Sequence, residues 1–91
     1  MNERTQKAAY ADLLAAVVEA LDVPLPSIAD VDERVYYLLL ERRVSDLRVV
    51  LAVMLSLGGD PWQNASVIRR RTAEEPVTYT PYEPRRNGVG R

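Results

Sequence analysis

The hydrophobic positions of this chain fall into three groups with helical spacing, and proline or glycine separates each group from the next. In the first group apolar residues recur every three or four positions, as they do on one face of a helix. These residues are Tyr10, Leu13, Leu14, Val17 and Leu21. The pattern predicts a helix over residues 3–21. The segment 23–27 (VPLPS) then ends it, because proline cannot occupy a helix interior without breaking it.

The second group predicts one long helix in the middle of the chain. Asp30 is followed three residues later by Glu33, the pattern of a capping box at a helix start. From Val31 to Leu57 no proline or glycine interrupts the chain, so the predicted helix is roughly 40 Å long. One continuous apolar stripe runs along it: Tyr36, Leu40, Val44, Leu47, Leu51 and Leu55.

The last turns of this long helix, residues 49–57 (VVLAVMLSL), are apolar on every side. A first helix of this length, folded back through a short link, is expected to cover the long helix from its start to about Arg48. A third helix covers only one side of the remainder. We therefore expect an exposed apolar patch on the side away from the third helix, and such patches mark interfaces. The predicted interface residues are Val49, Val50, Val53 and Leu57.

The third group begins after Gly58 and Gly59 with the sequence Asp60-Pro-Trp-Gln63. Asp is favoured at the helix N-cap, Pro at the first helical position and Gln three residues after the cap. A helix over residues 61–75 follows, and Pro76 ends it. Its apolar side chains are expected to pack against the end of the long helix.

The C-terminal segment alternates apolar and polar residues between prolines, which favours an extended arm. We expect arm contacts from Val77, Tyr79 and Tyr82, made either with the rest of this chain or with a partner. The predicted fold is therefore all-α: an antiparallel helical hairpin with a long central helix, a third short helix and an extended C-terminal arm. A three-helix domain occupies residues 1–75 and the arm residues 76–91.

Composition narrows the chemistry. The 91 residues carry a net charge of −1 and contain no Cys and no His. Disulfides, thiol nucleophiles, histidine acid–base catalysis and Cys/His metal sites are thereby excluded. We expect no catalytic residues, no metal and no cofactor. A polar N-terminal sequence, and no apolar run near the ~20 residues that span a membrane, lead us to expect a cytoplasmic protein with no membrane contact.

A basic cluster suggests a second type of function. Arg69, Arg70 and Arg71 on the third helix, with Arg85 and Arg86 in the tail, are possible phosphate contacts. Consecutive helical residues point about 100° apart, and acidic residues lie nearby, so no concentrated basic surface results. Any nucleic-acid binding is expected to be weak and salt-sensitive.

The preferred expectation is a non-enzymatic helical interaction module that self-associates through the C-terminal half of its long helix. Its partners are a second copy, as a dimer or higher oligomer, and another protein. An adaptor, an inhibitor and a structural component of a larger particle, such as a phage or a protein shell, all fit this expectation. The alternative is a small nucleic-acid-binding regulator that uses the Arg-rich helix and the basic tail.

Overall fold

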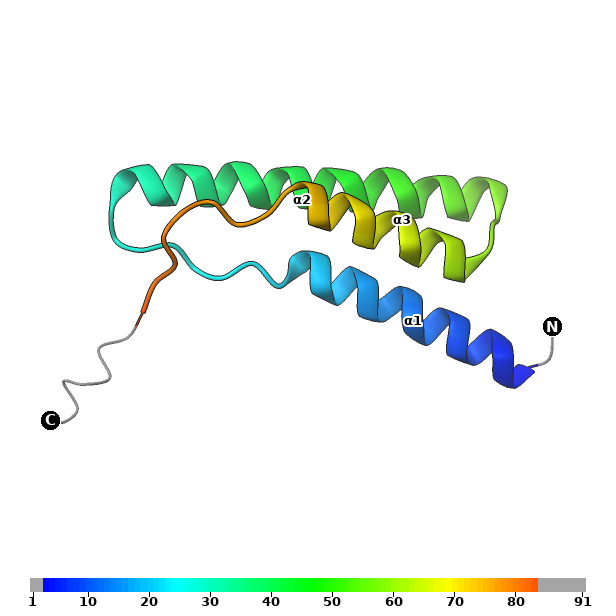
Figure 1. Cartoon of the computed structure of the whole chain (residues 1–91). Coiled ribbons are helices and arrows are strands. Elements are labelled where there is room, and N and C mark those ends of the chain that lie inside the picture. Colours follow the sequence, from blue (N-terminus) through cyan, green and yellow to red (C-terminus); the bar gives the residue numbers. More distant parts are fainter. Residues whose placement is uncertain (1–2, 84–91) are drawn as a thin grey trace, which may run out of the picture.

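The computed structural model describes residues 3–83 and contains three helices (Figure 1). They are α1 (Glu3–Leu21), α2 (Asp30–Leu57) and α3 (Pro61–Glu74). The all-α fold class is confirmed, and the predicted lengths of all three helices agree with the structure to within one or two residues.

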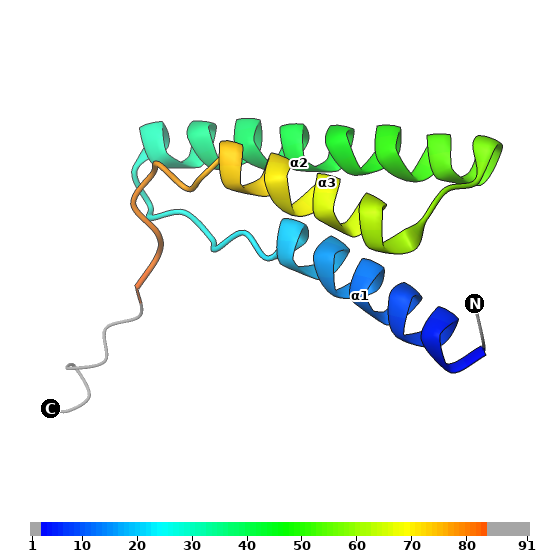
Figure 2. The same cartoon turned by 45° about the vertical axis from the view of Figure 1, so that its right-hand side comes forward.

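The three helices lie side by side, and α1 and α3 run in the same direction. Both α1 and α3 run antiparallel to α2, and α3 lies between the other two in both views (Figures 1 and 2). Helix α1 packs more extensively against α3 than against α2. Helix α3 therefore separates the two helices of the predicted hairpin over part of their length.

The core lies where all three helices meet, and its members are small or medium in size. They are Leu13, Ala16 and Ala20 from α1, Leu47 from α2, and Ala65 and Ile68 from α3. Alanines on α1 and α3 let these helices approach closely, which explains their tight packing. Across residues 3–83, no large side chain is completely buried. A single copy thus has only a thin core.

The position of α1 along α2 differs from the prediction. Helix α1 was expected to cover the start of α2, but its end at Ala20 lies beside Arg43, and Tyr10 near its start lies beside Leu55. It therefore covers the C-terminal half of α2. The reason is that residues 22–29 form no tight turn: eight extended residues reach up to roughly 26 Å, which moves α1 far along α2.

The start of α2 also differs from the prediction. Its N-cap is Ala29, and no side chain caps it, so the expected capping box of Asp30 and Glu33 is absent. Local bonds from a neighbouring residue fix this end instead. The Ser27 hydroxyl accepts from the backbone N–H of Ala29 at 3.1 Å and donates to the Asp32 carboxylate at 2.6 Å. The helix consequently starts one residue earlier than expected.

The turn from α2 to α3 follows the prediction closely. Gly58 has a φ of +80°, which glycine adopts without strain, and its N–H caps α2 by donating to Met54 O. Asp60 then caps α3 by accepting from the N–H of Trp62 at 3.1 Å. The capping-box bond expected from the Gln63 side chain to the Asp60 N–H is not formed, and the Asn64 side-chain amide instead donates to the other side of this residue, Asp60 O, at 3.0 Å.

After α3 the chain returns across the start of α2 and pairs with the link between α1 and α2. Pro26 and Pro81 form an antiparallel bridge. The N–H of Ser27 donates to Thr80 O at 2.9 Å, and the N–H of Tyr82 donates to Leu25 O at 2.7 Å. The part of the arm that the structure describes, residues 76–83, is extended as predicted, and it docks on its own chain.

Candidate interaction surfaces

The predicted patch at the end of α2 is only partly exposed. Val49, Val53 and Leu57 are 60%, 49% and 83% exposed. Val50, in contrast, packs against the core. Three of the four predicted residues thus present apolar surface to solvent, while Val50 contributes to the fold.

The patch does not lie on the side of α2 that the sequence indicated. Asp46, seven residues before Val53 and so on the same line of the helix, forms an ion pair with Arg71 of α3 at 3.4 Å. Val53 therefore lies along the α3 side of α2, not away from it. The expectation was wrong because it assumed that α1 stops at about Arg48, whereas α1 reaches the end of α2 beside Leu55.

A larger apolar surface lies on the other side of α2, and sequence reasoning missed it. Leu55 is 88% exposed, and Leu14 of α1 is 65% exposed. Both were assigned to stripes that pack between helices. The width of the α1 stripe was the sequence feature that indicated this surface. One neighbouring helix cannot bury all of its apolar side chains, which are Tyr10, Leu13, Leu14 and Leu21.

An open groove of about 410 Å³ separates the first half of α1 from the end of α2. Tyr10 and Leu13 line one wall, and Leu51, Met54 and Leu55 line the other. The backbone at Gly58 and Gly59 closes its end. The lining is thus almost entirely apolar, with the Tyr10 hydroxyl as its one polar side-chain group.

Of the three predicted arm contacts, Tyr79 is the buried one, at 5% exposed. Its hydroxyl donates to Pro24 O, and its ring meets the Tyr36 ring edge-on at 5.9 Å between centroids. Burial raises the pKa of the Tyr79 phenol, and the neighbouring Tyr36 raises it further. Val77 and Tyr82 are 39% and 53% exposed. Tyr79 therefore anchors the arm over the first half of α2.

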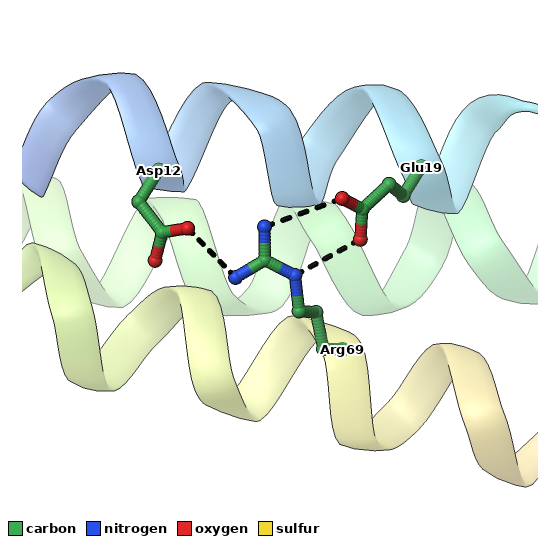
Figure 3. A network of polar contacts seen from close by, with 3 residues as sticks. All are labelled: Asp12, Glu19 and Arg69. Atoms are coloured by element: carbon green, nitrogen blue, oxygen red, sulfur yellow. Dashed lines mark hydrogen bonds and ion pairs between the residues drawn. The ribbon is translucent and has the colours of Figure 1, made fainter.

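The arginines of α3 mostly face acidic side chains of the same chain. Arg69 donates to Asp12 and to Glu19, both at 2.9 Å, and so joins α3 to α1 (Figure 3). The hydrogen bond from Arg69 lowers the pKa of the Glu19 carboxyl. Arg71 pairs with Asp46, and Arg70 is exposed. Arg85 and Arg86 lie outside the described residues.

One arginine, Arg43, is buried at the centre of the molecule and is only 5% exposed. Its guanidinium donates to Ala20 O at 2.8 Å and to Glu75 O at 2.7 Å. These carbonyls lie at the C-terminal ends of α1 and α3, where the helix dipole is negative. Arg43 thus caps two helices at once, a structural role that sequence reasoning did not anticipate.

The Glu75 side chain lies beside this cap. Loss of hydration raises the pKa of its carboxyl, and the nearby Asp46 raises it further. A carboxyl with a raised pKa is a feature of some active sites. Here, however, the neighbouring groups are helix-capping and ion-paired side chains, and the sequence supplies no Cys or His to act with it.

Within residues 3–83, no three Asp or Glu side chains gather in a way that would hold a metal ion. The helices of this part of the chain are also too short or too polar to cross a membrane. Comparison with protein-family models, with curated proteins and with solved structures finds no match to this chain.

Proposed function

We propose that this protein is a non-enzymatic helical interaction module that self-associates through the C-terminal half of α2. The observation that carries this proposal is the exposure of large apolar side chains there. Leu55 and Leu57 are 88% and 83% exposed, and Val49 is 60% exposed. Apolar surface concentrated in this way on a small domain is typical of an interface.

The energetic argument follows from the size of the core. Burying one such side chain stabilises a protein by about 1.5–3 kcal/mol, and small domains have a total stability of roughly 5–15 kcal/mol. Three or four exposed side chains on one helix end therefore forgo a free energy comparable to that of the whole fold. A second copy is the commonest partner that recovers it.

A nucleic-acid-binding regulator, the alternative considered from sequence, gains no support from the described residues. Arg69 and Arg71 already pair with Asp12, Glu19 and Asp46. Phosphate would have to displace those carboxylates. We place the module in the cytoplasm, since a chain without Cys fits a reducing compartment.

Sedimentation velocity of the purified chain, over concentrations from about 1 to 200 μM, tests the proposal. We expect a dimer or higher oligomer that dissociates on dilution. A monomer throughout this range would contradict self-association. A titration with a short DNA duplex at low salt provides the contrast, for which we expect weak binding that salt abolishes.

A further inference from the structure

The two sides of the α1–α2 pair are not equivalent. Ion pairs from Arg69 to Asp12 on α1 and from Arg71 to Asp46 on α2 mark the side that α3 covers. Residues half a turn from Asp12 and Asp46 therefore lie on the opposite side. We call that side the open face.

The open face carries two apolar stripes with the same spacing. On α1 the stripe consists of Tyr10, Leu14, Val17 and Leu21; on α2 it consists of Val44, Arg48, Leu51 and Leu55. Each set follows the order i, i+4, i+7, i+11, so each keeps to one line of its helix. Arg48 is the one charged residue among the eight.

The two stripes are level with each other at both ends. Ala20 lies next to Arg43, and Tyr10 lines the same groove as Leu55. Leu21 is therefore level with Val44 at one end, and Tyr10 with Leu55 at the other. Because the helices are antiparallel, the face has approximate twofold symmetry in its apolar pattern.

We propose that a second copy of this chain binds the open face with its own open face, around a twofold axis, so that two α1–α2 pairs form a four-helix arrangement. The inference rests on the proposed self-association and assigns its surface. An isologous interface uses the same surface on both copies, and the equal spacing of the two stripes lets the α1 stripe of one copy lie along the α2 stripe of the other.

The apolar area of the open face is comparable with the non-polar area that one partner buries in a protein interface. Five side chains expose large fractions there: Tyr10 45%, Leu14 65%, Leu21 45%, Val44 40% and Leu55 88%. A free side chain of these types presents on the order of 100–200 Å², so together they expose roughly 280–570 Å². A standard interface buries about 800 Å² per partner, of which slightly more than half is non-polar.

The patch of Val49, Val53 and Leu57 is the competing surface. It offers three side chains instead of five, and it lies on one helix beside α3. The groove of about 410 Å³ on the open face adds a recess that apolar side chains of a second copy can enter. The open face is accordingly the stronger candidate.

Leu55→Asp and Leu57→Asp form a matched pair, since both leucines are more than 80% exposed and lie two residues apart. We expect Leu55→Asp to raise the dissociation constant at least 100-fold in sedimentation velocity, because an Asp must stay hydrated. Leu14→Asp is expected to do the same from α1. Leu57→Asp and Val53→Asp are expected to change it less than threefold, with helicity retained in circular dichroism.

Each outcome has a distinct meaning. A wild-type monomer would contradict both the proposed function and this inference. Dissociation by Leu57→Asp or Val53→Asp, or a dimer that survives Leu55→Asp and Leu14→Asp, would overturn the open face while self-association stands.

Hydroxyl-radical footprinting of the wild type gives the same information even if a variant does not fold. On concentration from the monomer to the dimer range, we expect protection at Tyr10, Leu14 and Leu55 and unchanged reactivity at Leu57. Protection at Leu57 alone would overturn the inference.

Discussion

The two halves of α2 are covered in different ways. Around the C-terminal half, α1 and α3 supply regular helices, and the contacts are aliphatic: Leu47 is buried, and Leu51 and Met54 pack against the core. Around the N-terminal half, the cover is the irregular link and the arm. There the contacts are backbone hydrogen bonds and the aromatic pair Tyr36–Tyr79.

This difference indicates where the molecule opens first. Helices that share an apolar core unfold together, whereas a link and an arm held by a few hydrogen bonds open locally at lower free energy. Arg43 lies at the boundary, since it bonds the end of α1 and the end of α3. The comparison therefore predicts that the C-terminal half unfolds cooperatively and that the N-terminal half unfolds locally at a lower free energy. It also predicts that Arg43 couples the two halves.

The largest effect is expected from Arg43→Met, which keeps an apolar stem of similar length but leaves the carbonyls of Ala20 and Glu75 without their donor. Unsatisfied buried groups cost about 1–3 kcal/mol each, so we expect a loss of about 3–5 kcal/mol in urea unfolding. Arg42→Met, at the exposed neighbouring position, is the control and should change stability by less than about 0.5 kcal/mol. Equal effects would mean that Arg43 does not couple the two halves.

A smaller and more local effect is expected from Tyr79→Ala. Removing a buried aromatic ring from a well-packed site costs about 3–5 kcal/mol. In an arm that opens locally we expect a smaller loss, about 2–3 kcal/mol. Hydrogen exchange should show faster exchange over residues 31–39 and unchanged protection over residues 44–57. The half-exposed Tyr82 supplies the control, Tyr82→Ala. Faster exchange in both halves would contradict the comparison.

How much of this organisation was visible in the sequence depends on whether its cause is local. The bounds of α3 follow from Asp60 and Pro61 at one end and Pro76 at the other, so they were predicted. The level of α1 along α2 depends on the link, whose path is set by pairing with Thr80 and Tyr82 more than fifty residues later. No spacing rule within the first sixty residues contains that information.

The same limit applies to the surfaces. The sequence showed that α2 carries more apolar residues than its neighbours can cover, and Leu57 and Val49 are indeed exposed. It did not show which side α3 occupies, because that depends on contacts between different helices, such as those of Ala65 and Ile68 with the core and of Arg71 with Asp46. For this reason Leu55 was assigned to a packing stripe, although it is almost fully exposed.

Asp60→Ala tests how much α3 stabilises the C-terminal half of α2, and we expect a still smaller loss of stability. Loss of an Asp N-cap costs about 1 kcal/mol, and the loss should appear in the single cooperative transition of α1, α3 and the end of α2. Gln63→Ala is the control, since the bonds at Asp60 come from Trp62 and Asn64 and not from the Gln63 side chain. If Gln63→Ala had the larger effect, the capping arrangement at the start of α3 would be wrong.

The smallest effect concerns the ion pairs between α1 and α3. Arg69 lowers the pKa of Glu19 in the folded chain below its ordinary value of 4.5, so the ionised carboxylate stabilises the fold above that pH. As the pH falls through the lowered pKa, the carboxylate is protonated and this contribution is lost. Both side chains are well exposed, and solvent screens them, so the loss should be small.

An NMR titration of the Glu19 carboxyl checks the sign. In Arg69→Met its pKa should rise towards the ordinary value, and the urea midpoint should fall less between pH 5.5 and pH 3 than in the wild type. Arg70→Met, one position along on an exposed side of α3, should leave the Glu19 pKa unchanged. If both variants shifted that pKa equally, the general positive charge of α3 would be responsible, and the hydrogen bond from Arg69 to Glu19 would not hold α3 against α1.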